Sequence, residues 1–274
     1  MQRSVPGAVA FGMLALVSIG RTANAQSKHP LVGKVHASEI NAKVKLNDSQ
    51  SARVQRVKLV RLVDQLIASA TAIHSSYEGA TYVGRLRSGA YVFQSTLQLD
   101  VDGSIYCRQT PYGQPYTSLR LSNGSALDAD IVPYVVLPVR SSGVFKGVEI
   151  GDVAVLIYHN KVAYAVVGDR GPANKLGEAS LETFRLLGAE RVLKTNHGLP
   201  NSSGSCLRAF PSHTAKGRLE VAGLGANKDP ITTIVFPGTR SLIDLGGTAS
   251  LIASTDQVAA HYWSQISKLG FAAH

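Results

Sequence analysis

The stretch VVGDRGPANKLGEAS, residues 166–180, carries the pattern from which we read both the fold and the chemistry of this chain. Two valines end an apolar run at Asp169, and the glycines and proline that follow interrupt any regular element. Glu178 then stands where a helix is expected to begin, because acidic residues favour a helix N-terminus. The stretch therefore predicts one carboxylate at a strand end and a second, nine positions later, at a helix start.

Apolar, β-rich runs surround this stretch on both sides. Residues 152–158 and 161–167 are joined at His159-Asn160, which predicts a hairpin with a two-residue turn. Residues 131–138 predict a buried strand, which its two prolines restrict to a sheet edge or a bulge. Residues 231–236 predict a further strand that ends at Pro237-Gly238.

Two segments have helical periodicity. Residues 50–75 place leucines and isoleucines on one face and charged side chains on the other, behind N-cap candidates at Asp48 and Ser49. Residues 254–269 predict a final helix with Gly270 as its stop. The expected fold class is therefore mainly β, of the α+β type, with one N-terminal amphipathic helix and one C-terminal helix.

From Tyr91 to Asp102 the side chains alternate between apolar and polar, which predicts a strand with one polar face. Residues 108–127 lack periodicity and form a long loop, a kind of segment that often carries function. Such polar faces and loop tyrosines are typical of sugar-binding clefts and, equally, of ordinary solvated surfaces. The candidate substrate-binding residues are Asp100, Asp102, Asp128, Asp130, Asp152, Tyr112 and Tyr116.

The N-terminus predicts export. Arg3, an apolar run over residues 5–19 and the sequence Ala23-Asn24-Ala25 form a signal peptide with cleavage after residue 25; a retained anchor is the alternative. Export permits one disulfide between Cys107 and Cys206, the alternative being two buried thiols. The predicted division is a signal peptide (1–25), a basic arm with its helix (26–80) and a catalytic β domain (81–274).

The net charge of +10 is concentrated away from the two carboxylates. Residues 26–90 contain ten Lys/Arg and four Asp/Glu, whereas residues 91–200 contain ten of each. A nucleic-acid enzyme would be expected to surround its chemistry with basic residues, so this class is not favoured. The chain also lacks a nucleophile elbow, metal-binding spacing and a phosphate loop. We therefore expect no metal, no cofactor and no nucleic-acid partner, and a monomer.

Carboxylates remain as the candidate chemistry. Cleavage of a glycosidic bond needs one acid for the leaving oxygen and one base or nucleophile for the anomeric carbon. Asp169 and Glu178 fit that division, although a strand end and a helix cap would account for the same two residues.

The blocks Gly168-Asp169-Arg170-Gly171-Pro172 with Gly177-Glu178-Ala179-Ser180, and residues 127–138, resemble the signature of the family 75 glycoside hydrolases, which are chitosanases. The resemblance implies hydrolysis of chitosan with Asp169 and Glu178 as the essential pair, in an inverting reaction. Several members have a polar, acidic insertion after the aspartate, where this chain has Arg170 to Lys175.

Asp169-Arg170-Gly171-Pro172 also resembles an element of double-psi β-barrels, as in expansins and rare lipoprotein A. That resemblance implies a barrel and assigns the general acid to Asp169, with Glu178 as base or water-positioning group. It also supplies the rival hypothesis, a non-hydrolytic module that binds or remodels cell-wall glycan.

Overall fold

In this computed structural model, the described residues are 48–73, 76–104, 114–139, 143–188, 191–193, 205–206, 218–220, 225 and 229–271. The predicted signal peptide and basic arm lie outside these residues. No helix within the described part of the chain is both long and apolar enough to cross a membrane.

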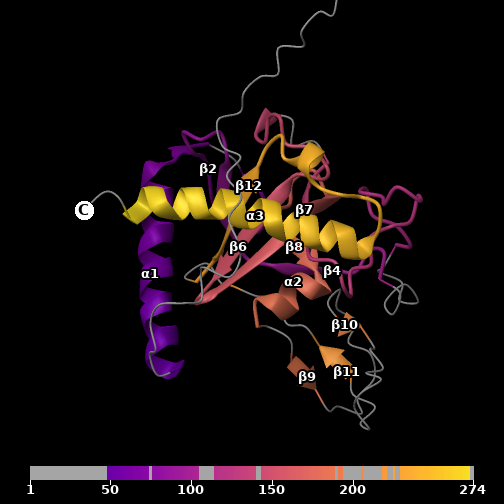
Figure 1. Ribbon diagram of the computed structural model, residues 1–274, viewed down its shortest axis with the longest axis horizontal. Coiled ribbons are helices and arrows are strands. Elements are labelled where there is room, and N and C mark those ends of the chain that lie inside the picture. Colours follow the sequence, from indigo (N-terminus) through magenta and orange to yellow (C-terminus); the bar gives the residue numbers. More distant parts are fainter. Residues whose placement is uncertain are drawn as a thin grey trace, which may run out of the picture. The chain divides into compact units, whose positions relative to one another are not determined.

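A nine-stranded mixed sheet dominates the fold (Figure 1), in the order β1-β2-β3-β12-β6-β7-β5-β8-β4. Its strands are β1 (Thr71–Ala72), β2 (Ala80–Arg85), β3 (Tyr91–Ser95), β4 (Gln98–Asp100), β5 (Tyr134–Pro138), β6 (Val153–Tyr158), β7 (Lys161–Gly171), β8 (Glu178–Ser180) and β12 (Ile231–Phe236). A second sheet has the order β10-β11-β9, with β10 at Ser205–Cys206, β11 at Arg218–Glu220 and β9 at Arg191–Leu193. The fold is thus mixed α/β and mostly β, and the double-psi crossing stays a prediction.

Both faces of the central strands are buried, because side chains of opposite parity enter two different cores. Tyr91 and Phe93 join one cluster with Val135, Leu156 and Val167. Side chains of the other parity pack against helices α1 (Asp48–Ser69) and α3 (Thr248–Phe271), and Val92, Val155, Ile234, Leu62, Leu66 and Ala259 belong to this second cluster. Figure 1 shows α3 lying across the strands.

A third cluster lies on the part of the sheet that matters for function. Tyr134, Val136 and Val166 pack there with Leu127 and Leu251, so the loop before β5 and the start of α3 cover this end of β5 and β7. The two carboxylates singled out in the sequence lie next to this cluster: Asp169 is near the end of β7, and Glu178 is the first residue of β8.

Several elements match their predicted positions. β6 and β7 form the predicted hairpin, with Tyr158 paired to Lys161 across the turn and His159 at a φ of 55°. β12 covers residues 231–236 as predicted. α3 begins at Thr248, earlier than the predicted cap at residues 254–256, since Gly246-Gly247 interrupts the chain before it.

Three expectations near the site need correction. The strand predicted from Tyr91 to Asp102 is two strands, because the chain leaves β3 after Ser95 and β4 pairs with β8 at the other end of the sheet. Glu178 does not open a helix, because it belongs to β8 and the N-cap of α2 (Leu181–Leu186) is Ser180, whose hydroxyl accepts the backbone N–H of Thr183. β5 is not an edge strand, because it lies between β7 and β8. The two prolines fit because Pro133 precedes the strand and Pro138 is its last residue; the pairing of β5 with β7 does contain a bulge, but at Val135 and Val136, away from both prolines.

Candidate active site

Strand register places the two predicted catalytic carboxylates on one face of the sheet. Val136 on β5 pairs with Asp169 on β7 and with Glu178 on β8. Residues paired across neighbouring strands point to the same side, so Asp169 and Glu178 flank Val136 on its face. Their backbones are two strand spacings apart, about 9.6 Å.

A glycine bulge determines which way Asp169 faces. Val135 pairs with Val167 and Val136 with Asp169, which leaves Gly168 as the extra residue. Without it, Asp169 would share the parity of Val167 and enter the first core. A Cβ at Gly168 would lie 2.6 Å from the Cβ of Tyr134, so this position requires glycine. The glycine before the aspartate therefore has a direct role in presenting it.

Asp169 is buried, with 6% of its surface exposed, and one of its oxygens accepts three hydrogen bonds. Oδ1 accepts the backbone N–H of Ser118 at 2.9 Å, the hydroxyl of Ser118 at 2.5 Å and the backbone N–H of Arg170 at 2.7 Å. Among the described residues, no hydrogen bond to Oδ2 is seen. These donors hold the carboxyl group in one orientation and leave one oxygen for chemistry.

Glu178 is held by a lysine three positions before it. The Nζ of Lys175 donates to Oε1 at 2.7 Å, and about a fifth of each side chain is exposed. Oε2 lies against Gly171 of β7, where an added Cβ would come within 2.9 Å of it and within 2.8 Å of Val136 Cγ1. The carboxylate of Glu178 thus leans across β5 toward the strand that carries Asp169.

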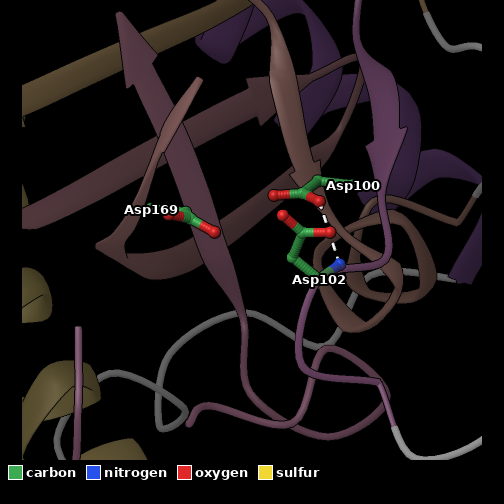
Figure 2. A group of neighbouring side chains, drawn as sticks. All are labelled: Asp100, Asp102 and Asp169. Atoms are coloured by element: carbon green, nitrogen blue, oxygen red, sulfur yellow. Dashed lines mark hydrogen bonds between the residues drawn. The ribbon is translucent and has the colours of Figure 1, made fainter. Parts of the chain in front are cut away.

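Asp100 and Asp102 approach Asp169 from the end of β4. One carboxylate oxygen from each of the three residues lies within 4.8 Å of the others, and Figure 2 shows the Asp169 carboxyl pointing toward the other two. Asp100 Oδ1 accepts the backbone N–H of Asp102 at 3.0 Å, and Asp102 Oδ1 accepts that of Gln114 at 2.8 Å. The strand end and the following loop therefore build an acidic group, the Asp100–Asp102–Asp169 cluster.

The pKa of Asp100 is raised to about 7: burial is the largest cause and the charges of Asp102, Asp169 and Glu178 add to it, while the hydrogen bond from Asp102 opposes the rise. Burial likewise raises the pKa of Asp102. Like charges this close resist full ionisation. A shared proton relieves the repulsion, and so would a hard cation with oxygen ligands, although Ca²⁺ takes about six to eight of them.

Tyr134 ties the loop after β4 to β5. Its hydroxyl donates to the backbone carbonyl of Asp102 at 2.9 Å. Burial, together with the negative charges of Asp100, Asp169 and Asp102, raises the Tyr134 pKa well above its usual value. The phenol therefore stays protonated and continues to donate, which fixes Asp102 next to Asp169.

The remaining predicted binding aspartates are engaged elsewhere. Asp152 is fully buried, and its carboxylate accepts backbone N–H groups of Thr239, Arg240 and Glu149, so it joins β6 to the turn after β12. Asp130 is buried and accepts the hydroxyl of Ser104, while Asp128 accepts the backbone N–H of Asp130. The structure brings Asp100 and Asp102 to Asp169 but does not place these three in the same cluster.

The structure describes only some of the predicted tyrosines and cysteines. Tyr116 is 51% exposed, with the guanidinium of Arg120 at 5.2 Å from its ring centroid. Tyr112 and Cys107 lie outside the described residues, and only the backbone of Cys206 is described, in β10. The predicted disulfide is therefore untested.

Sequence reasoning missed three residues of the site: Ser118, Lys175 and Tyr134. Ser118 lies 51 positions from Asp169 in a loop without periodicity, and no local pattern marks it. Lys175 could have been found, because a lysine three positions before a glutamate is a common ion-pair spacing. The apolar run around Tyr134 indicated a core residue, which it also is.

Comparison with known proteins places the chain in a family. No curated protein matches the chain. The family model described as fungal chitosanase of glycosyl hydrolase group 75 matches residues 97–242. That match includes β4 with Asp100, the loop with Ser118, and the strands that carry Asp169 and Glu178. The chain belongs to the chitosanase family of glycosyl hydrolase group 75.

Proposed function

We propose that the protein is an exported endo-chitosanase that hydrolyses β-1,4 bonds between glucosamine units with inversion, using Asp169 and Glu178. The observation that carries this proposal is the register at Val136, which puts two carboxylates from neighbouring strands on one face. Inverting glycosidases hold their carboxyl groups roughly 6.5–9.5 Å apart so that a water fits beside the sugar. A backbone separation of two strand spacings is compatible with that requirement.

In the proposed reaction Asp169 is the general acid. Its proton passes to the glycosidic oxygen as the bond between that oxygen and the anomeric carbon breaks. Glu178 accepts a proton from a water molecule, whose oxygen forms the new bond on the opposite face of the anomeric carbon. One water is consumed, and before the next turnover Glu178 releases its proton to solvent while Asp169 takes one up, so both carboxyl groups return to their starting states.

The neighbours of the two residues support this division of roles. The Lys175 ammonium donates a hydrogen bond to Oε1 of Glu178, which fixes the orientation of the proposed base. Asp169 instead lies beside Asp100 and Asp102, with one oxygen of each carboxyl group within 4.8 Å of the others. Burial raises the pKa of both neighbours, so these groups can hold protons next to the proposed acid. The same cluster offers negative charge to the ammonium groups of chitosan, a polycation.

Release of reducing ends from chitosan tests the proposal. The wild-type protein should release them, and Glu178→Gln should lower kcat by roughly 10²- to 10⁴-fold, because glutamine cannot accept the proton of water. Glu182→Gln is a matched control, since Glu182 forms a comparable ion pair with Arg185 three positions away. Glu178→Gln with full activity would exclude this pair. An inactive wild type that sediments with cell walls would favour the rival binding module.

A further inference from the structure

The hydrogen bonds of Asp169 distinguish its two oxygens. Three donors converge on Oδ1, two from Ser118 and one from the backbone of Arg170. A protonated carboxyl group has one hydroxyl and one carbonyl oxygen, and only an oxygen without the proton is free to accept several hydrogen bonds. Oδ1 is therefore the accepting oxygen, whichever protonation state Asp169 has.

The direction of the Ser118 hydroxyl is also fixed by its surroundings. The backbone N–H of Arg170 donates to Ser118 Oγ at 3.2 Å as well as to Asp169 Oδ1. Two backbone N–H groups, those of Ser118 and Arg170, already point at Oδ1, and an N–H group can only donate. Oδ1 is therefore the oxygen without the acidic proton, and the Ser118 hydroxyl, 2.5 Å away, donates its own proton to it.

We propose that Ser118 is a positioning residue that keeps Oδ1 of Asp169 unprotonated, so that the proton delivered to the glycosidic oxygen resides on Oδ2. This inference rests on the proposed role of Asp169 as general acid. Ser118 acts through Asp169 and has no contact with substrate in this role. The loop that carries Ser118 also carries the tyrosines that were predicted as sugar contacts, and in this proposal it orients the acid as well.

The side chain can be removed without removing the loop. The backbone N–H of Leu119 donates to the carbonyl of Gly168 at 2.8 Å, and the backbone N–H of Ser118 donates to Asp169 itself. Both bonds survive in Ser118→Ala, so the segment should stay against β7. Ser118→Thr retains the hydroxyl and provides the conservative variant.

The experiment compares two substrates that differ in their need for an acid. Chitosan has a poor leaving group that must be protonated, whereas a dinitrophenyl glycoside of a chitosan oligosaccharide releases a stable anion without protonation. For Ser118→Ala we expect kcat on chitosan to fall roughly 10- to 100-fold, the effect of losing a hydrogen bond to a carboxyl group. KM should be unchanged, and kcat on the dinitrophenyl substrate should fall about threefold or less.

Controls separate this inference from the proposed function. Ser118→Thr should recover most of the chitosan activity. Ser254→Ala should match wild type, because the hydrogen bonds of the Ser254 hydroxyl go to backbone groups of Asp244, before α3, and of Ser250 and Leu251, within α3. Equal loss on both substrates, or no loss in Ser118→Ala, would overturn the role of Ser118 while leaving the chitosanase proposal intact. A wild type inactive on chitosan would overturn the proposed function itself.

Discussion

Asp152 and Asp169 are two buried aspartates that each follow a glycine and border a strand, yet the structure treats them differently. Asp152 has hydrogen bonds on both oxygens: Oδ1 accepts the N–H groups of Thr239 and Arg240, and Oδ2 accepts that of Glu149. Asp169 accepts three donors on Oδ1 alone. Its other oxygen is turned toward no donor within the described part of the chain.

We propose that this difference separates a structural carboxylate from a reactive one. When both oxygens are bonded, the carboxylate links segments of chain and has no capacity to exchange a proton with a ligand. When one oxygen is held and the other is not, the orientation is fixed while one position remains for the reaction, which is the preorganisation that acid catalysis needs. The Gly-Asp dipeptide alone does not distinguish the two cases.

The largest expected effect is loss of turnover in Asp169→Asn. Asparagine keeps an oxygen for the three donors on Oδ1 but places an amide where the acidic proton belongs, so kcat should fall by roughly 10²- to 10⁴-fold. The melting temperature should be close to that of wild type. Steady-state assays on chitosan and thermal unfolding measure both. Retained turnover would mean that the comparison with Asp152 has no catalytic meaning.

The reciprocal change, Asp152→Asn, should lower stability and leave the chemistry alone. Either orientation of the new amide turns its NH₂ toward backbone N–H groups that donate to the wild-type carboxylate, and a buried unsatisfied donor costs about 1–3 kcal/mol. We expect the free energy of unfolding in urea to fall by about 2–3 kcal/mol. The kcat per folded molecule should be unchanged, and a selective fall in kcat would place Asp152 in the reaction after all.

Asp100→Asn tests the electrostatic repulsion among the carboxyl groups of Asp100, Asp102 and Asp169. The pKa of Asp100 is raised from 3.8 to about 7 in the folded chain, so the folded state binds more protons than the unfolded state within that range. Wild-type stability from this group is thus fully present below pH 4 and is lost as the pH rises through 7. The gain in melting temperature from Asp100→Asn should be near zero at pH 4 and greatest at pH 8. A gain in melting temperature that does not depend on pH would contradict repulsion among these carboxyl groups.

The smallest effect is expected from the lysine on Glu178. Lys175→Met removes a partner that is largely shielded from solvent, and kcat should fall about tenfold, because loss of the charge-assisted hydrogen bond frees the base to adopt other orientations. Arg185, the ion-pair partner of Glu182, is about half exposed, so Arg185→Met should change neither kcat nor KM. Lys175→Arg should recover part of the loss. Equal effects of the two methionine variants would show that ion pairing here has no link to catalysis.

The elements that the sequence predicted correctly are those determined by short-range turn and hydrophobic patterns. The hairpin at His159-Asn160, the strand over residues 231–236 and the buried run that ends at Asp169 follow from turn chemistry and apolar runs, and the structure has them. Glu178 was placed in a helix because an acid before an apolar run suits either a helix start or a strand end. Pairing with Val136 and Gln98 decided for the strand, and pairing is not encoded locally.

The site itself was predictable only at its two motif residues. Asp169 and Glu178 were chosen by spacing and family resemblance, whereas Ser118 arrives from a loop 51 positions away. Asp100 was one of five aspartates predicted to bind substrate. Only the path of the chain after β4 brings Asp100 and Asp102 to Asp169, whereas Asp152 contacts Thr239 instead. Long-range contacts of this kind depend on the whole topology, so no window of sequence contains them.

We propose that Asp169 and Glu178 act on opposite faces of one sugar with a water molecule on the side of Glu178. Proton NMR of the reducing end formed in the first minutes of chitosan hydrolysis tests this arrangement, because the configuration of the new anomeric centre is recorded before mutarotation changes it. We expect the α-anomer, the product of inversion at a β-1,4 bond. Initial formation of the β-anomer would require a covalent intermediate and would exclude this arrangement.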